Sequence, residues 1–207
     1  MKGICYIIGA GDNSGTNFSK DEKNNDCVIA ADGGLKTLLE LKIAPDYIIG
    51  DFDSLGYVPE GEHVIKHKVQ KNDTDMMLAV QFAMEMGYQN IIIFGGTGGE
   101  RIDHTFANIQ TMLYASRRNV TVRMTDAVNE YFVITDSEIE ISPKEKGNLS
   151  VFSLGGEAVG VDIKGAMYTT DKVTLRPDCT LSVSNSFIGN KVNIKVEKGS
   201  LLIITDK

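Results

Sequence analysis

The sequence predicts an α/β domain with a parallel sheet over residues 1–126, followed by an antiparallel β domain, a sandwich or barrel, over residues 127–207. Three observations support this prediction. The first 126 residues alternate between short β-branched runs and segments with helical spacing. The later residues alternate apolar and polar side chains in steps of two, with glycines at the turns. A chain of 207 residues is also long enough for one large or two small domains.

Six runs in the first part are expected to be strands, because each is apolar and ends at a glycine or a carboxylate. They are GICYIIGAGD, CVIAADGG, YIIGDFDS, EHVIKHKV, NIIIFGGTGG and VTVRMTD. Their continuous apolar character is typical of parallel strands that are buried on both faces. The sequence therefore predicts a parallel sheet whose connections are helices.

Helices are expected over LKTLLELK, over residues 75–86 and over residues 103–118. The second of these has three candidate caps, Asn72, Asp73 and Thr74, and Gly87 as its stop. In the second part, strands are expected over NEYFVITDSEIEI, LSVFSLGG, AVGVDIKGAMY, LSVSNSFIG, KVNIKVEKGS and LLIITD. Period-two alternation between glycine turns favours antiparallel pairing of these strands.

Charge and cysteine content narrow the function classes. The formal net charge is -7, which repels a phosphate backbone, so nucleic acid is not expected as a partner. Cys5, Cys27 and Cys179 are far apart and odd in number, which indicates neither a disulfide framework nor a zinc site and fits a reducing cytoplasm. The first apolar run is too short for a signal peptide or a bilayer span, so neither targeting nor a membrane anchor is expected.

Acidic residues follow the predicted parallel strands, where ligands bind in open α/β sheets. They are Asp12, Asp32, Asp51, Asp53, Asp73, Asp75 and Asp103. Any one of them could simply cap a helix or make a turn. Together they would repel one another unless a cation neutralised them, so the sequence supports a magnesium hypothesis. Asp51-Phe52-Asp53 would place two carboxylates on one side of an extended segment, although D-x-D is a weak signal alone.

The glycine loop, residues 95–99, follows a buried strand and precedes Arg101 at a predicted helix start. Glycines let backbone amides approach an oxyanion, and an arginine can bind phosphate oxygens, so the segment resembles a phosphate cradle. The common nucleotide-binding fingerprints are absent. His104 could orient a phosphate or cap the helix. Gly9-Ala10-Gly11 could approach a nucleotide or form a tight turn. The polar residues of Ser184–Phe187 could simply form the turn before the next glycine.

Five motifs in series resemble the thiamine pyrophosphokinase family. They are ADGG, PDYIIGDFDS, KNDTD, GGTGGERIDHTFANI and VSNSF. The resemblance spans nearly the whole chain and implies an α/β nucleotide-binding domain, a C-terminal β-sandwich that binds thiamine, and a homodimer with active clefts between subunits. It also implies transfer of pyrophosphate from ATP to the thiamine hydroxyl, with Mg²⁺, giving thiamine diphosphate and AMP.

The resemblance also implies roles for particular residues. Catalytic roles fall to Asp51, Asp53, Asp73, Asp75, Arg101 and Asp103, where Asp73, Asp75 or Asp103 is the base for the alcohol. Magnesium would be held by Asp32, Asp51, Asp53 and Asp75. ATP would be bound by Gly9, Gly11, Asp32, Gly33, Lys71, Thr97, Gly98, Arg101 and His104. Thiamine would be bound by Ser184, Asn185, Ser186 and Phe187.

Two departures from the family pattern and three other functions stay open. Glu100 stands between the glycines and Arg101, where the family pattern has arginine directly after the glycines. The chain has no tryptophan, so an aromatic ring stacked on thiamine must come from Tyr or Phe. The alternatives are a Mg²⁺-dependent phosphohydrolase, a sugar-nucleotide transferase that uses the same motifs, and a non-catalytic thiamine or nucleotide sensor.

Overall fold

The computed structural model describes residues 2–52, 57, 63–66, 73–99 and 101–207. The chain divides into two compact units. The first unit comprises Met1–Thr111 and Val120–Ala127, and the second comprises Met112–Asn119 and Val128–Lys207. The last part of helix α3 (Ile102–Ser116) therefore groups with the second unit, although its sequence follows the helical pattern of the first part.

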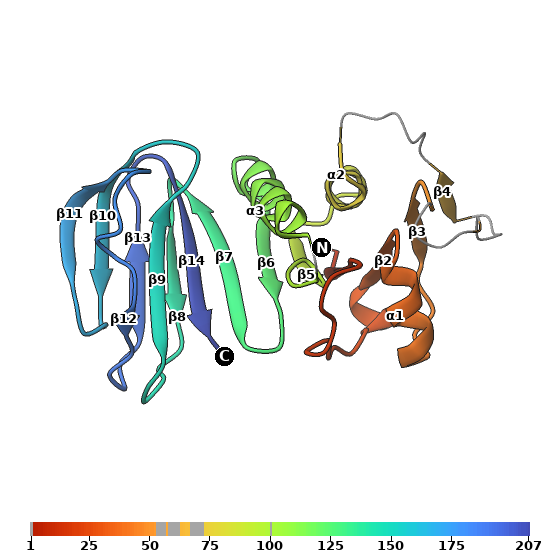
Figure 1. Cartoon of the computed structure of the whole chain (residues 1–207), viewed down its shortest axis with the longest axis horizontal. Coiled ribbons are helices and arrows are strands. Elements are labelled where there is room, and N and C mark those ends of the chain that lie inside the picture. Colours follow the sequence, from red (N-terminus) through yellow and green to blue (C-terminus); the bar gives the residue numbers. More distant parts are fainter. Residues whose placement is uncertain (1, 53–56, 58–62, 67–72, 100) are drawn as a thin grey trace. The chain divides into compact units, whose positions relative to one another are not determined.

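The first unit contains a parallel sheet of six strands in the order β6-β5-β1-β2-β3-β4 (Figure 1). Each of the six expected strands is present. Their bounds are β1 Ile4–Ile8, β2 Cys27–Ala31, β3 Tyr47–Gly50, β4 Val64–Lys66, β5 Asn90–Phe94 and β6 Thr121–Thr125. The two central strands β1 and β2 are almost wholly buried, as their continuous apolar runs predict.

Three α-helices accompany this sheet: α1 Gly34–Leu41, α2 Asp75–Glu85 and α3 Ile102–Ser116, besides the 3-10 turn η1 Glu22–Asn24. Helix α1 packs against one face of the sheet through Leu35 and Leu38, and α2 lies on the other face (Figure 1). Of the candidate caps for α2, Thr74 is the one used, since its hydroxyl accepts a hydrogen bond from the Met77 amide at 3.2 Å. Among the helices of the described residues, none combines the length and apolar character needed to cross a membrane.

The second unit is a β-sandwich, one of the two architectures that the alternating pattern predicts. Its strands pair antiparallel in the orders β12-β9-β14-β7 and β11-β10-β13-β8 (Figure 1). Their bounds are β7 Asn129–Thr135, β8 Glu138–Ile141, β9 Asn148–Ser153, β10 Ala158–Lys164, β11 Thr170–Leu175, β12 Asn185–Ser186, β13 Val192–Lys195 and β14 Ser200–Asp206. Side chains from both sheets, such as Leu149 and Ile163, form one shared core.

Two expectations for the second unit were wrong in detail. The run LSVSNSFIG is not a full strand: its first residues form turns, β12 pairs with β9, and Phe187 forms an isolated bridge to Ala166. The physical reason is local, because Ser184 adopts a left-handed φ of 57°, which interrupts an extended chain. Strand β11 was missed because its polar, mostly exposed residues have little apolar alternation.

Candidate active site

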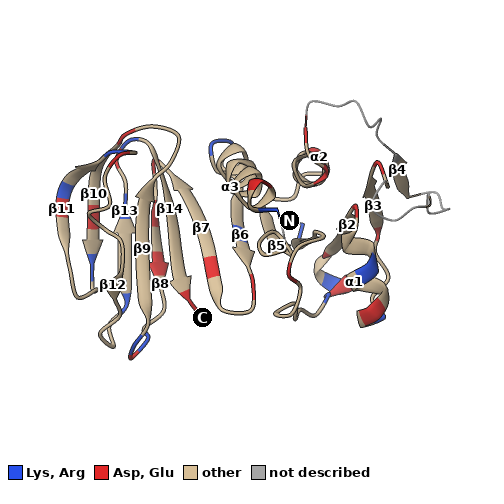
Figure 2. Ribbon diagram, in the orientation of Figure 1, with Lys and Arg blue, Asp and Glu red and all other residues tan. Residues whose placement is uncertain are grey.

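Three carboxylates meet at the carboxyl edge of the parallel sheet and form the acidic cluster: Asp32, Asp51 and Asp75. One oxygen of each lies within 4.8 Å of an oxygen of the other two, and all three side chains are half-buried. Figure 2 shows acidic residues after β2 and β3 and on α2. Three like charges so close together favour a bound cation, and carboxylate oxygens are ligands that Mg²⁺ prefers.

Each carboxylate is placed by its own local structure. Asp32 follows β2 with a left-handed φ of 46°, and its amide donates to the Ile49 carbonyl of the neighbouring strand at 2.8 Å. Asp51 follows β3 and precedes Phe52, whose side chain is buried. Asp75 begins α2, where the helix dipole stabilises a negative charge. Asp53, the fourth predicted ligand, lies outside the described residues.

A cavity of about 310 Å³ adjoins the acidic cluster. It is lined by residues from the turn after β1, from the end of β2, from the starts of α2 and α3, and from the glycine loop. These residues are Gly9, Ala10, Gly11, Ala31, Asp32, Thr74, Asp75, Met76, Gly95, Gly96, Thr97, Gly98, Gly99, Arg101, His104, Thr105 and Asn108. The cavity therefore brings two members of the acidic cluster together with the predicted phosphate cradle.

The glycine loop is fixed by hydrogen bonds to its carbonyl groups. The carbonyls of residues 95, 96 and 97 accept from the Gly11 amide at 2.8 Å, the Asn108 side chain at 2.7 Å and the Asp12 amide at 2.7 Å, respectively. In a trans peptide the next N–H points to the opposite side from the carbonyl, and the described peptides contain no cis bond. Each amide of residues 96–98 therefore points away from the partner of the carbonyl before it, and these are the amides that the predicted phosphate cradle would use.

Two residues that the sequence analysis did not predict, Asp126 and Asn13, also hold this region. The Thr97 hydroxyl donates to the buried Asp126 carboxylate at 2.9 Å. The Asn13 amide donates to the carbonyls of Gly9 at 2.9 Å and Gly11 at 3.1 Å. A signal for Asp126 was present, because it directly follows β6 as the other acids follow their strands. Asn13 comes two residues after Gly11, where a turn-forming side chain is common.

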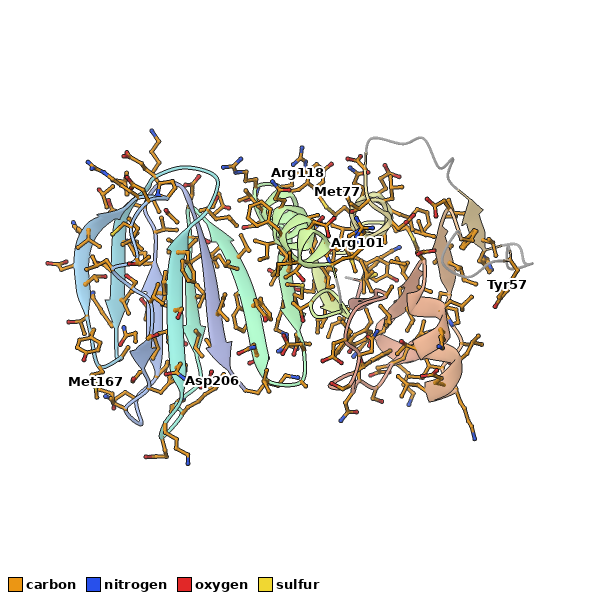
Figure 3. The ribbon with its side chains drawn as sticks, viewed as in Figure 1. Tyr57, Met77, Arg101, Arg118, Met167 and Asp206 are labelled. Carbon is orange, nitrogen blue, oxygen red and sulfur yellow. The ribbon has the colours of Figure 1, made fainter. Side chains whose placement is uncertain are left out.

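Arg101 and Asp103 form an exposed, two-bonded ion pair at the start of α3, where Figure 3 labels Arg101. The shorter contact joins Arg101 Nη2 to Asp103 Oδ2 at 2.6 Å. This hydrogen bond lowers the pKa of the Asp103 carboxyl. Asp103 is therefore a poorer base than an ordinary aspartate. Asp73, whose carboxylate accepts from Gln81 at 3.4 Å, lies outside the cavity lining, as Asp103 does.

The predicted thiamine segment lies in the second unit, and its four side chains have different environments. Asn185 is buried, and its amide is turned inward: Oδ1 accepts from the Tyr168 amide at 2.9 Å, and Nδ2 donates to the Tyr168 carbonyl at 2.6 Å. Phe187 belongs to the sandwich core. Ser184 is exposed and Ser186 is half-buried. The neighbouring residue Met167, labelled in Figure 3, is exposed, and its amide donates to the Ser186 carbonyl.

Comparison with known proteins identifies the family. The family model "Thiamin pyrophosphokinase, catalytic domain" matches residues 18–124, which is more than half of the chain. The chain belongs to the thiamin pyrophosphokinase family. The model "Thiamin pyrophosphokinase, vitamin B1 binding domain" also matches, over residues 136–201. The predicted family and enzyme class are thereby confirmed.

This thiamin pyrophosphokinase family member aligns with its relatives over nearly the full length of both chains. The thiamine pyrophosphokinase of Bacillus subtilis (strain 168) is 28% identical over 212 residues, which span 99% of this chain and 98% of the relative. A crystal structure of thiamine pyrophosphokinase from Bacillus subtilis superposes with a TM-score of 0.86 at 26% identity and covers 99% of both chains. One from Geobacillus thermodenitrificans has a TM-score of 0.82 at 25% identity, covering 99% and 97%.

The predicted nucleotide, metal and catalytic residues of this family member fall into three groups. The acidic cluster and the cavity lining bring together Asp32, Asp51, Asp75, Gly9, Gly11, Thr97, Gly98, Arg101 and His104. Gly33, Asp73 and Asp103 lie outside that lining, and Gly33 is the N-cap of α1. Asp53 and Lys71 lie outside the described residues, as does Glu100, so the effect of Glu100 on the loop stays a prediction.

Proposed function

We propose that this thiamine pyrophosphokinase uses ATP as its pyrophosphoryl donor and releases AMP together with thiamine diphosphate. The observation that carries the proposal is the acidic cluster beside a cavity lined by the glycine loop. Backbone amides and an arginine suit phosphate oxygens, and the carboxylates suit a divalent cation that binds phosphates as well. A triphosphate satisfies both kinds of group at once.

The chemistry of the acidic cluster fits magnesium. Asp32, Asp51 and Asp75 would hold the ion, and we keep Asp53 as a fourth proposed ligand. When bound, Mg²⁺ neutralises charge on the phosphate oxygens. The chain's own groups do the positioning: the loop amides and His104 orient the phosphates, and Arg101 and Lys71 counter the charge that develops on them. Phosphoryl transfer depends mainly on such positioning and charge stabilisation.

Three carboxylates, those of Asp73, Asp75 and Asp103, are candidate bases for the thiamine hydroxyl. Asp103 has a lowered pKa because Arg101 hydrogen-bonds to it, and Asp73 lies outside the cavity lining with Asp103. Asp75 lies in the lining, so we assign the acceptance of the hydroxyl proton to the Asp75 carboxylate oxygen that does not hold the ion. A weak base is sufficient when the leaving group departs early in a loose transition state.

We propose that thiamine binds to the second unit through Ser184 and Ser186, whose side chains are not buried. Asn185 and Phe187 support that surface from the interior of the sandwich. The Asn185 amide hydrogen-bonds to the Tyr168 backbone, and the Phe187 ring lies in the core. This assignment changes the roles expected of Asn185 and Phe187 from contact to support. Tyr168 is exposed beside the segment and is a candidate for the aromatic contact that tryptophan cannot supply here.

A product assay tests the reaction. With ATP, Mg²⁺ and thiamine, AMP and thiamine diphosphate should appear in equal amounts, and chelation of the metal should stop both. Release of ADP or phosphate with unchanged thiamine would instead support a phosphohydrolase or a sugar-nucleotide transferase. Binding of thiamine or nucleotide without turnover would support a sensor.

We further propose a cytoplasmic homodimer with active clefts between subunits. The acidic cluster and the thiamine segment belong to different units, and apolar side chains such as Met167, Tyr168 and Leu181 are exposed on the second unit, where a partner could cover them. Three free thiols fit a reducing compartment. Light scattering should give a mass near twice the 22.6 kDa of one chain, and a monomer mass at all concentrations would reject the dimer.

A further inference from the structure

Two buried cysteines face each other on neighbouring central strands of the first unit. Cys5 on β1 is paired in register with Cys27 on β2, and the strands run parallel. Because the two residues are direct register partners, their side chains leave the sheet on the same face. Neighbouring strands lie roughly 4.7–4.9 Å apart, which falls within the roughly 4.4–6.8 Å that a disulfide allows between its Cα atoms. The backbone therefore places the two thiols close enough for a covalent bond.

The two thiols differ in access and in ionisation. Cys5 is fully buried, whereas Cys27 lines a second cavity of about 430 Å³ together with Lys20, His63 and Tyr88. The hydrogen bond between the thiols raises the pKa of Cys5 and lowers the pKa of Cys27. Cys27 is thus the sulfur that a small reagent meets first and the one that ionises more easily. Nucleophilic cysteines have these two properties.

This place is separate from the site described above. Cys5 stands near the start of β1 and Cys27 begins β2, whereas the acidic cluster and the glycine loop follow the carboxyl ends of their strands. The proposed transfer of pyrophosphate uses neither thiol. The Tyr88 hydroxyl donates to the Asn25 carbonyl at 3.0 Å and also contacts the Cys27 thiol. Lys20, which pairs with Asp46 at 2.7 Å, also helps to lower the pKa of Cys27.

We propose that Cys5 and Cys27 form a dithiol site that small disulfides oxidise to an intramolecular disulfide. The Cys27 thiolate attacks one sulfur of the reagent, which forms a mixed disulfide and releases one reagent thiolate. The Cys5 sulfur then attacks the Cys27 sulfur, which forms the Cys5–Cys27 bond and releases the second reagent thiolate. The two cysteine protons end on the two released thiolates. The cysteines lose two electrons, and the reagent gains them.

The experiment uses bis(2-hydroxyethyl) disulfide and the folded full-length protein. The background is Cys179→Ser, which removes the exposed thiol and any pairing between chains through it. The expected result is the loss of both remaining thiols. Tryptic digestion without reduction should then join peptide 3–20 to peptide 24–36, and a reducing agent should separate them.

Two further variants in this background assign the order of attack. Without Cys5 (Cys5→Ser), Cys27 should stop as a stable mixed disulfide that carries one mercaptoethanol unit. Without Cys27 (Cys27→Ser), Cys5 should stay unmodified because it is buried. Circular dichroism checks that each variant folds, and if either does not, the peptide map of the Cys179→Ser protein decides alone. Two thiols that stay free in the folded protein, or a mixed disulfide that never proceeds to the linked peptides, would overturn the proposal.

Discussion

The acidic cluster depends on single residues that three separate segments deliver. Asp32 and Asp51 end neighbouring strands, and Asp75 begins a helix, so one substitution can remove one charge without disturbing the others. The carboxylates repel one another when no cation is bound, so removing one charge also relieves strain. Loss of function and loss of stability are therefore separable at this cluster.

We expect Asp75→Asn to lower turnover by about 100-fold or more, because removing charge stabilisation at a transition state typically costs this much. The free energy of unfolding should change by no more than about 1 kcal/mol, since relief of repulsion offsets the lost interaction with the α2 dipole. Steady-state AMP formation and urea unfolding measure the two effects. Asp178→Asn, at an exposed position of the second unit, is the matched control and should keep full activity. Near-normal turnover in Asp75→Asn would remove this residue from the site.

The hydrogen bond from the Thr97 hydroxyl to the buried Asp126 carboxylate holds the glycine loop in position. Thr97→Val keeps the shape of the side chain but removes a donor from a buried carboxylate, and hydrogen bonds to charged groups contribute about 1.5–3 kcal/mol. We expect the KM for ATP to rise by about tenfold or more, with little change in the KM for thiamine. Thr97→Ser retains the hydroxyl and should stay close to the parent. Equal effects on both substrates would indicate general destabilisation rather than positioning.

At the scale of elements, the close packing of α1 against β1 explains the second glycine of the ADGG motif. A Cβ atom on Gly34, the first residue of α1, would lie 1.9 Å from the Ile8 carbonyl oxygen. Helix α1 therefore approaches the end of β1 as closely as only glycine allows. This contact places the turn after β2, with Asp32, beside the turn after β1.

We expect Gly34→Ala to reduce the free energy of unfolding by about 3 kcal/mol or more, because the clash is with backbone and overpacking costs this order. Gly87→Ala is the matched comparison. Gly87 has a left-handed φ of 87° and open space around it, so only the backbone strain of about 1–2 kcal/mol applies. Urea unfolding at neutral pH measures both variants. Similar losses in the two would contradict the packing argument.

At the scale of the whole molecule, one contribution to the pH dependence of stability comes from an ion pair that joins two segments far apart in the sequence. Lys20 pairs with Asp46 at 2.7 Å, and Asp46 also accepts from the Val28 amide at 2.8 Å. The hydrogen bond from Lys20 to Asp46 raises the pKa of Lys20. A raised lysine pKa stabilises the fold fully below the unfolded value of about 10.4. That stabilisation disappears as the pH rises through the folded value.

We expect Lys20→Met to reduce the free energy of unfolding by about 0.2–1 kcal/mol at pH 7, as for partly exposed ion pairs. The difference from the parent should persist through neutral pH and shrink above about pH 10.4, where the unfolded chain releases the lysine proton before the folded protein does. Urea unfolding across this range measures it. Lys36→Met, at an exposed position of α1, controls for a change in net charge. A deficit that grows as the pH rises would contradict the sign of the effect.

Much of the fold could be predicted because its information is local. The apolar runs around Ile7 and Ile29 and the Thr74 cap each depend on a few neighbouring residues, and the structure confirms the corresponding elements. The thiamine segment could not be predicted in the same way. The inward turn of the Asn185 amide depends on Tyr168, which lies 17 residues away.

By itself, the sequence determined the order of the elements, the change from parallel to antiparallel strands and the family, because periodicity and serial motifs are properties of the linear chain. Only the tertiary structure decided which carboxylates meet, that Asp126 holds the glycine loop and Asn13 the turn after β1, and that Cys5 faces Cys27. These facts depend on the order of strands in the sheet, in which β1 lies between β2 and β5. Long-range pairing of this kind is set by the packing of the whole core, and no short segment encodes it.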